Sequence, residues 1–250
     1  MDLKLKDKVA IVTGASRGLG AAAAIALVNE GARVVVTGRS TAELEGLAAR
    51  YPGRIHAETC DMRDMAAVAA LAPKAVEIFG KLDIVVNNAG IAPASAFVDH
   101  SVEGLEELMA VNVIAPAVLS QAAGRHMITR GEGGKIINVA SISGIRGKAV
   151  LVGYSASKGA LIQMTKALAA EWARYDIQVN AIAPGGFVTE AQAAVVNNPD
   201  VLKKRVRKIP AGRMADRAEM GPLVCYLASE LSNFVTGSVA VIDGGETAKI

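Results

Sequence analysis

Short runs of β-branched and other apolar residues alternate along the chain with longer stretches rich in Ala and Leu. The short runs are continuously apolar instead of alternating with polar residues, which is typical of strands covered by helices on both faces. Seven such runs predict strands at 9–13, 33–37, 54–60, 82–88, 134–141, 177–183 and 238–243. Because most of them are separated by a helical stretch, we expect parallel strands joined by right-handed crossovers.

The stretches between the strands predict helices at 18–30, 41–50, 65–80, 101–128, 153–175 and 216–229. Pro73 lies inside the third of these and should kink it or divide it in two, because proline removes a helical N–H donor. The residues at 186–215 are expected to form a long irregular excursion that serves as a substrate lid. Without a linker or repeat, residues 1–250 are predicted to form one Rossmann-like, doubly wound α/β domain of about seven parallel strands, with helices on both faces.

The composition narrows the class of protein. Of the 250 residues, 52% are hydrophobic but only 4% are aromatic, so the core must be built from Ala, Val, Ile and Leu. A net charge of +3 does not indicate a nucleic-acid partner. Cys60 and Cys225 are far apart, which excludes a disulfide framework and fits a reducing compartment. The N-terminus resembles no signal peptide, no run reaches membrane-spanning length, and the three histidines form no metal-ligand pair. We expect a cytoplasmic protein without a metal or a membrane partner.

A glycine-rich segment, "TGASRGLG" (13–20), joins the first predicted strand to the first predicted helix. Gly14, Gly18 and Gly20 would let a pyrophosphate approach the backbone, and the helix N-terminus would supply free N–H groups and partial positive charge. Its place between a strand and a helix makes the pattern far more specific than glycines alone. The segment predicts a dinucleotide site.

The end of the second strand bears on the choice of cofactor. An Asp or Glu there would bond the ribose 2′-hydroxyl of NAD, whereas an Arg suits the 2′-phosphate of NADP. The sequence reads "VVVTGRS", with Gly38 and Arg39 at this place, and Arg17 of the glycine segment could reach the same phosphate. We expect a preference for NADP(H). NAD(H) stays possible, with Arg39 then serving only as a surface charge.

Tyr154 and Lys158 stand four apart in "GYSASKGALI" (153–162), so on a helix they would share one face, with Cβ atoms roughly 5–6 Å apart. An ammonium about 4 Å from the phenol, at an effective dielectric constant of about 20, contributes ~4 kcal/mol and would lower a pKa that is ordinarily ~10. Burial opposes this, and the expected pKa lies somewhat above neutrality. The small neighbouring residues are expected to leave room for a cofactor and a substrate.

Six motifs in register resemble those of the short-chain dehydrogenase/reductase family. They are "TGASRGLG", "NNAG" (87–90), "VNV" (111–113), Tyr154-Ser-Ala-Ser-Lys158, "PGGFVT" (184–189) and "IDGG" (242–245). The likeness covers essentially the whole chain. It implies an oxidoreductase that interconverts a ketone and a secondary alcohol by hydride transfer to or from a nicotinamide.

The resemblance implies a catalytic set of four residues. Tyr154 would be the general acid or base, and Lys158 would bond the nicotinamide ribose and acidify the phenol. Ser141 would hold the substrate oxygen, with Ser143 as a second candidate for substrate contact. Asn112 would anchor a water that links Lys158 to a proton relay.

The resemblance also implies a set of cofactor contacts along the carboxyl ends of the strands. They are Gly14, Ser16, Arg17, Gly18, Leu19, Gly20, Arg39, Asp61, Met62, Asn88, Ala89, Gly90, Tyr154, Lys158, Pro184, Gly185, Val188 and Thr189. Asp61 would meet the adenine, whereas Val188 and Thr189 would hold the nicotinamide carboxamide.

The substrate is less defined than the reaction. The sequence segments near Trp172 and at 209–237 are similar to those of gluconate and deoxygluconate dehydrogenases. The same segments of many 3-oxoacyl carrier-protein reductases are similar as well. The basic run "KKRVRK" (203–208) is either a solvated helix face or an attractor for an anionic small-molecule substrate. The resemblance implies a homotetramer. A dinucleotide-binding regulatory protein without catalysis is the rival interpretation, although all four residues of the catalytic set are present.

Overall fold

The computed structural model describes residues 1–249, and its centre is one parallel sheet of seven strands in the order β3-β2-β1-β4-β5-β6-β9. The strands are β1 (Val9–Thr13), β2 (Arg33–Gly38), β3 (Ile55–Thr59), β4 (Ile84–Asn87), β5 (Gly134–Val139), β6 (Ile177–Pro184) and β9 (Val239–Ile242). The strand order reverses between β1 and β4. At such a reversal the loops after the two strands diverge and leave a crevice where ligands bind in open α/β sheets.

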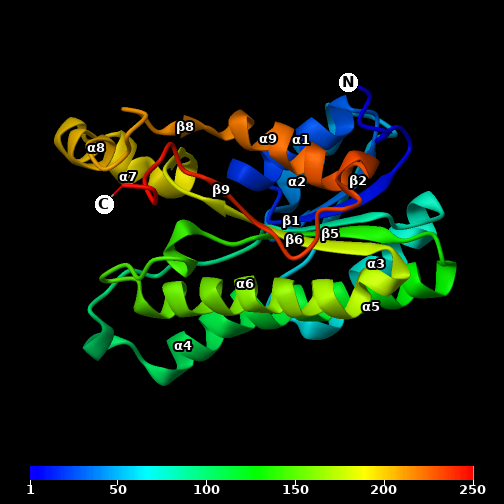
Figure 1. Ribbon diagram of the computed structural model, residues 1–250, viewed down its shortest axis with the longest axis horizontal. Helices are drawn as coiled ribbons and strands as arrows, with labels where there is room; N and C mark the ends of the chain where they lie inside the picture. The colour runs from blue at the N-terminus through cyan, green and yellow to red at the C-terminus, as the bar shows by residue number, and fades with distance from the viewer. Residues whose placement is uncertain (250) are drawn as a thin grey trace.

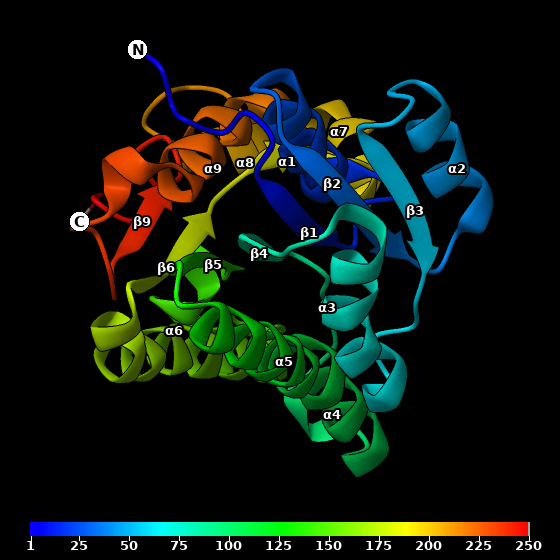
Figure 2. The same cartoon turned by 90° about the vertical axis from the view of Figure 1, so that its right-hand side faces the viewer.

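Helices cover both faces of the sheet (Figure 1). The helices on one face are α1 (Gly18–Asn29), α2 (Thr41–Ala49) and α9 (Gly221–Ala228). Those on the other face are α3 (Met65–Phe79), α4 (Val102–Met109), α5 (Ala115–Arg130) and α6 (Val152–Trp172). Figure 2 shows the two layers from the side, with the sheet between them. The predicted doubly wound, Rossmann-like fold is confirmed.

Each face of the sheet has its own core, which explains the continuous apolar runs. On β1, Ala10 and Val12 are buried in the core under α1 and α9, whereas Ile11 between them is buried in the core over α3 and α5. Trp172 belongs to the second core and is 8% exposed, in keeping with a packing role. Because both sides of every central strand are covered, apolar side chains are needed at consecutive positions.

Of the two outcomes predicted for Pro73, a kink or a division of the helix, the division does not occur, since α3 runs from Met65 to Phe79 without a break. Pro73 is exposed, so the carbonyl that loses its N–H partner lies on the side that faces water. Val68, Leu71 and Ala75 are buried on the opposite side and hold the helix against the core. Tertiary packing here outweighs the local cost of the proline.

The helical stretch predicted at 101–128 contains a turn of π-helix at Ala110–Ile114, between α4 and α5. Such single wide turns are often found at functional sites, because they move one side chain out of the helical register. Asn112 lies in this turn and is fully buried. The structure thus gives a special backbone position to one of the predicted catalytic residues.

The segment 186–215, called the excursion below, is more regular than predicted. It contains α7 (Ala193–Val196) and α8 (Pro199–Val206), and Asn198 caps α8 by accepting from the N–H groups of residues 200 and 201. Its ends are joined by a small parallel sheet of β7 (Phe187–Val188) and β8 (Ala215–Asp216). The prediction of an irregular segment missed α8 because its pattern is mostly polar, with the few apolar positions in a helix only two turns long.

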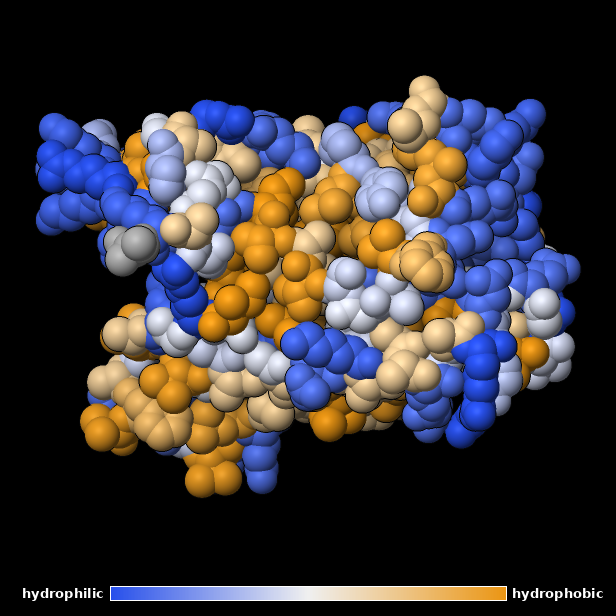
Figure 3. Space-filling view, in the orientation of Figure 1, coloured by the Kyte–Doolittle hydropathy of each residue, from blue (hydrophilic) through white to orange (hydrophobic). Residues whose placement is uncertain are grey.

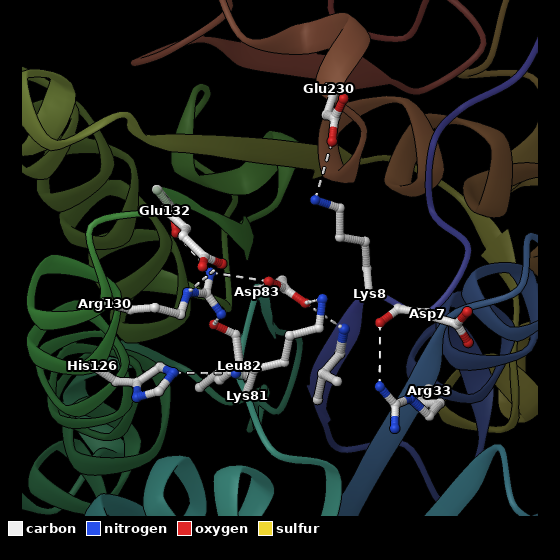
Figure 4. A network of polar contacts seen from close by, with 12 residues as sticks. Asp7, Lys8, Arg33, Lys81, Leu82, Asp83, His126, Arg130, Glu132 and Glu230 are labelled. Carbon is white, nitrogen blue, oxygen red and sulfur yellow. Dashed lines mark hydrogen bonds and ion pairs between the residues drawn. The ribbon is translucent and has the colours of Figure 1, made fainter.

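The amino ends of the strands are tied together by a polar network (Figure 4). The buried carboxylate of Asp83 accepts the N–H of Val9 (2.8 Å) and pairs with Lys81 (3.1 Å) and Arg130 (3.0 Å). His126 accepts the N–H of Leu82 at 3.3 Å. These contacts join β1, β4 and α5 at the edge opposite the predicted site. Within residues 1–249, none of the helices combines the length and the apolar character needed to cross a membrane.

Candidate active site

The glycine segment forms a tight turn between β1 and α1. Gly14 and Gly18 have φ values of +64° and +59°, in the left-handed region that favours glycine. A methyl group on Gly20 would overlap the Gly14 carbonyl oxygen and the Asn88 side chain. Gly20 therefore serves close packing of α1 on the turn itself, whereas direct approach to a phosphate was predicted for all three glycines.

Asn88 fastens this turn to the end of β4. Its side-chain amide donates to the carbonyls of Thr13 (2.9 Å) and Gly14 (3.2 Å). In return, the Thr13 hydroxyl oxygen accepts the N–H groups of Asn88 and Ala89, both at 3.0 Å. Thr13 was not predicted as a site residue. The available signal was a polar residue that ends an apolar strand directly before the first glycine.

Two exposed arginines stand at the end of β2 and in the glycine turn. A Cβ on Gly38 would lie 3.7 Å from the Ser16 hydroxyl, so the end of β2 is close to that turn. Arg17 and Arg39 are both exposed, and the positive charge of Arg39 contributes to lowering the pKa of Asp61. No carboxylate follows β2 directly. This corner combines a hydroxyl with two cations.

Asp61 follows β3 and already has a side-chain partner. Its carboxylate accepts hydrogen bonds from Arg63 at 3.0 Å, which lower the pKa of Asp61 to about 2. Arg63 also pairs with Glu107 of α4 at 3.3 Å. The neighbouring Met62 is buried, and Leu19 on α1 is partly buried against the first core. Asp61 and Met62 thus stand just beyond the carboxyl end of β3, and Leu19 stands at the start of α1.

Tyr154 and Lys158 lie on one side of α6, as predicted, with the Lys158 Nζ 5.8 Å from the centre of the Tyr154 ring. Lys158 is 3% exposed and donates to the carbonyl of Val139 at 2.8 Å. Burial lowers the pKa of Lys158 to about 8. Its ammonium is therefore held between the end of β5 and the phenol by a single backbone acceptor.

The pKa of the Tyr154 phenol is raised in the structure, whereas a lowered pKa was expected beside the Lys158 ammonium. Burial raises the pKa of Tyr154 above its ordinary value, and a hydrogen bond with Ser141 only partly opposes this. Desolvation disfavours the phenolate, while the Lys158 ammonium is directed to the Val139 carbonyl. In this arrangement the phenol is protonated at neutral pH.

Ser141 lies directly beyond β5, at the N-terminus of a 3-10 turn (Ile142–Gly144). Its hydroxyl oxygen accepts the N–H of Ser143 at 3.1 Å, and both serines are mostly buried. The same hydroxyl interacts with Tyr154. Ser141, in the turn after β5, thus lies beside Tyr154 of α6, whereas the backbone N–H of Ser143 is engaged by the Ser141 hydroxyl.

Asn112 connects the π turn to both neighbouring segments. Its amide oxygen accepts the N–H of Ile91 and its amide nitrogen donates to the carbonyl of Ile91, both at 2.9 Å. It also donates to the Ser157 hydroxyl at 3.0 Å, and Ser157 donates to the carbonyl of Tyr154 at 2.8 Å. A Cβ on Gly90 would lie 3.2 Å from the Asn112 oxygen and 3.3 Å from the Lys158 Nζ. Asn112 and Lys158 therefore line the same narrow space.

Two glycines near Tyr154 serve close packing between elements. A Cβ on Gly153 would lie 2.9 Å from the Leu105 side chain of α4. One on Gly144 would lie 2.6 Å from the Lys158 backbone, so the turn after Ser141 rests directly on α6. Close contact between these elements brings the serine, the tyrosine and the lysine together.

A buried polar network beneath the site was not predicted. The side chain of Asn87 donates to Ser120 (3.1 Å) and Asn138 (2.8 Å), and Asn138 donates to Thr165 (2.9 Å). These four residues, all at most 2% exposed, join β4, β5, α5 and α6. Asparagines within otherwise apolar strands, in "VVNN" and "IINVA", were the signal for it, since buried polar groups need partners.

The "PGGFVT" segment leads from β6 into the excursion. Pro184 is the last residue of β6, and Gly185 packs against Asp243, to which a Cβ would come within 2.6 Å. Val188 is 41% exposed, and Thr189 lies 3.8 Å from where a Gly18 Cβ would be. The segment thus crosses from the end of β6 to the glycine turn and borders the same crevice.

The carboxyl side of the sheet thus carries the glycine turn, the Tyr154 phenol, the Ser141 hydroxyl and the buried Lys158 ammonium. No cluster of three or more His, Cys, Asp or Glu side chains within residues 1–249 is arranged to hold a metal ion. A parallel sheet whose strand order reverses beside a glycine-rich turn is typical of Rossmann-like α/β proteins, and the chain belongs to this class.

Comparisons with known proteins identify the family within that class. Residues 14–247 match the family model described as enoyl-(acyl carrier protein) reductase. The chain is 38% identical over 250 residues to 2-dehydro-3-deoxy-D-gluconate 5-dehydrogenase of Dickeya dadantii, covering 98% of this chain and 97% of that protein. It is 34% identical over 249 residues to 3-oxoacyl-[acyl-carrier-protein] reductase of Aquifex aeolicus, covering 98% and 99%.

A solved structure of a related dehydrogenase has the same fold as this chain. The crystal structure of gluconate 5-dehydrogenase from Burkholderia cenocepacia, in complex with NADP and tartrate, matches with a TM-score of 0.94 and 34% identity over 100% of this chain and 98% of that one. The chain belongs to the short-chain dehydrogenase/reductase family. It is an NAD(P)-dependent oxidoreductase that acts on CH–OH groups.

Proposed function

We propose that the protein is an NADP(H)-preferring oxidoreductase that interconverts a ketone and a secondary alcohol, with Tyr154 as general acid and base. The observation that carries this proposal is the meeting of Ser141 and Tyr154 beside the buried ammonium of Lys158. Asn112 completes the set through the Ser157 hydroxyl and the narrow space that it shares with Lys158.

The glycine turn fits a dinucleotide, because its left-handed glycines leave a cradle at the N-terminus of α1. The predicted contacts on the turn, on residues 88–90 and on the "PGGFVT" segment follow the carboxyl ends of β1, β4 and β6. The nicotinamide, when bound, supplies or accepts a hydride at the substrate carbon. All other steps belong to side chains of this chain.

In the reductive direction, the substrate carbonyl oxygen accepts hydrogen bonds from the Ser141 and Tyr154 hydroxyls. Tyr154 transfers its proton to this oxygen as negative charge develops there. Lys158 is cationic at neutral pH, with a pKa of about 8, and stabilises the phenolate that remains. Because burial raises the pKa of Tyr154, reduction is favoured at neutral pH, whereas oxidation, which needs the phenolate, is favoured in alkali.

The preference for NADP(H) rests on the corner formed by Ser16, Arg17 and Arg39. Two exposed cations and a hydroxyl suit a 2′-phosphate, and no carboxylate stands directly after β2 to bond a free 2′-hydroxyl. NAD(H) use is the alternative, in which the arginines remain surface charges.

For the substrate we propose a sugar acid, in keeping with the names of the similar dehydrogenases. The exposed cations of α8 suit such an anion. A 3-oxoacyl thioester is the second candidate, because a carrier-protein reductase is similar over the same length. We also propose a homotetramer in the cytoplasm, the latter in keeping with the two buried free thiols, Cys60 and Cys225.

The experiment that tests the reaction is a turnover assay with NADPH and NADH against keto-sugar acids, 3-oxoacyl thioesters and neutral ketones. Tyr154→Phe removes the proton donor and is expected to lower kcat by at least about a hundredfold. It should leave the Kd for NADPH unchanged within a factor of about two. Normal turnover by Tyr154→Phe would disprove the mechanism.

Arg39→Asp tests the choice of cofactor. It replaces a cation by a carboxylate where a ribose 2′-hydroxyl would bind, so kcat/KM should fall with NADPH and rise with NADH. Arg50→Asp, on an exposed position at the end of α2, controls for the change in net charge. Equal effects of both variants on NADPH would argue against a phosphate contact by Arg39.

A further inference from the structure

The last residues of the described chain follow a defined path beside the excursion. The Asp243 carboxylate accepts the N–H groups of Gly245 (2.8 Å) and Thr247 (2.6 Å). The N–H of Ala211, on the excursion, donates to the carbonyl of Gly244 at 2.9 Å. In Figure 1 the red end of the chain lies beside α7 and α8.

Glu246 pairs with Arg205 of α8 through both carboxylate oxygens, at 2.8 and 2.6 Å. The two side chains are only 19% and 16% exposed. The guanidinium also lies against the backbone of Gly186, where a Cβ would come within 2.9 Å of it. Arg205 is thus enclosed between the start of the excursion and the C-terminal residues, unlike the exposed Lys203 and Lys204 beside it.

Arg146 holds the same C-terminal residues from the opposite side. Its guanidinium donates to the carbonyls of Glu246 (3.5 Å), Lys249 (3.2 Å) and Thr247. The N–H of Arg146 donates to the Ile142 carbonyl at 2.9 Å, so this arginine belongs to the turn that begins at Ser141. The C-terminal segment therefore contacts α8 through the Glu246 side chain, and it contacts the turn of the predicted substrate-binding serine through its backbone carbonyls.

We propose that residues 243–249 form a clasp that holds the excursion over the substrate side of Tyr154, with Glu246, Arg205 and Arg146 as positioning residues. The side-chain contacts of the clasp are charge-assisted hydrogen bonds, which are stronger than those between neutral groups. Removing either member of the bidentate pair leaves the other as a mostly buried charge without its partner, which is strongly unfavourable. The substrate role of the clasp rests on the proposed function, whereas its structural role does not.

Hydrogen exchange tests the structural role. In Glu246→Gln, the backbone amides of α8 and of residues 244–249 should exchange about tenfold faster, because the clasp opens more often. Arg205→Met should do the same, and the double variant should exchange no faster than either single variant, since both act on one contact. The amides of β1 and β4 should be unchanged in all three.

Glu219→Gln is the matched control. Glu219 forms a bidentate pair with Arg213 of the excursion at 2.6 and 2.8 Å, and this pair shares no residue with the Glu246–Arg205 and Arg146 contacts. It should leave exchange in α8 unchanged. Equal acceleration by Glu219→Gln, no acceleration by Glu246→Gln, or faster exchange throughout the protein would overturn the proposal.

Kinetics test the substrate role. Glu246→Gln and Arg146→Met are expected to raise the KM of the substrate about tenfold, with kcat and the Kd for NADPH within about twofold of the parent protein. Glu246→Asp should restore part of the loss. An unchanged KM in both variants would overturn this role. A parent protein without turnover on the whole panel would count against the proposed function alone, because hydrogen exchange still decides whether the clasp exists.

Discussion

Gly20 shows how strictly one position can be constrained. It is the third residue of α1, and its α-carbon faces the Gly14 carbonyl and the Asn88 amide. That amide also fastens the turn to the end of β4. A side chain there would separate the helix from the strand on which the dinucleotide site depends.

Gly20→Ala is therefore expected to lower the free energy of unfolding by ~1–3 kcal/mol through overpacking. It should also weaken NADPH binding, because the turn must move. Gly46→Ala is the control, since nothing lies within 4 Å of a Cβ at that position inside α2. That change should stabilise the protein by up to about 1 kcal/mol. Chemical denaturation measures both, and a neutral Gly20→Ala would contradict the packing.

Lys135 is a buried cation that the proposed mechanism does not use. It is the first buried residue of β5, and its ammonium donates to the Asn233 side-chain oxygen at 2.6 Å. Burial lowers the pKa of Lys135 to about 8, although Asp176 and Glu230 oppose this. The folded protein therefore releases this proton at a lower pH than the unfolded chain does.

The sign of the resulting pH dependence follows from that difference. Between pH 8 and about 10.5 the unfolded state binds more protons at Lys135, so this residue's contribution to stability rises with pH. A pKa of about 8 instead of 10.5 corresponds to about 3 kcal/mol. Denaturation across this range should show the free energy of unfolding of the parent protein rising relative to that of Lys135→Met, by about the same amount. A constant difference would contradict a buried cation.

At the scale of the element, α3 shows local propensity overruled by packing. Pro73 stands in its middle, yet the buried side formed by Val68, Leu71 and Ala75 keeps the helix continuous. The π turn before α5 shows the reverse, because there the regular helix is interrupted and Asn112 is placed in the site. Propensity alone predicts neither outcome.

Pro73→Ala should raise the free energy of unfolding by ~1–3 kcal/mol, since it restores the missing N–H donor on an exposed side. Pro199→Ala is the matched control at the first position of α8, where a proline removes no helical hydrogen bond. It should change stability by less than about 0.5 kcal/mol. Thermal unfolding of both variants is the measurement, and no gain from Pro73→Ala would mean that the helix is already distorted to accommodate the proline.

At the scale of the whole molecule, the predicted site residues lie along the carboxyl edge of the sheet. Figure 3 shows hydrophobic surface along the middle of one face and strongly hydrophilic surface around the excursion. Lys203, Lys204, Arg207 and Lys208 are exposed there, whereas Arg205 is paired with Glu246. These four exposed cations give this part of the surface a positive charge.

This charge predicts a salt effect. The KM for a sugar acid should rise severalfold between about 0.05 and 0.5 M salt, because screening weakens the attraction, whereas the KM for a neutral ketone should stay constant. The double variant Lys203→Gln, Lys204→Gln should show a smaller salt effect. A flat response in the parent protein would leave the cations without a role in substrate capture.

The sequence by itself determined the parallel sheet, the helices on both faces and the side of α6 that carries Tyr154 and Lys158. These follow from periodicity and from motifs read along the chain. The tertiary structure alone decided whether Pro73 breaks its helix, how burial acts on the pKa of Tyr154, and what the small residues around it contact. It also revealed the network of Asn87 and Asn138 and the path of residues 243–249 between α8 and Ser141. The physical reason is that burial, desolvation and close contact depend on segments distant in the sequence, and no local pattern records which of them meet.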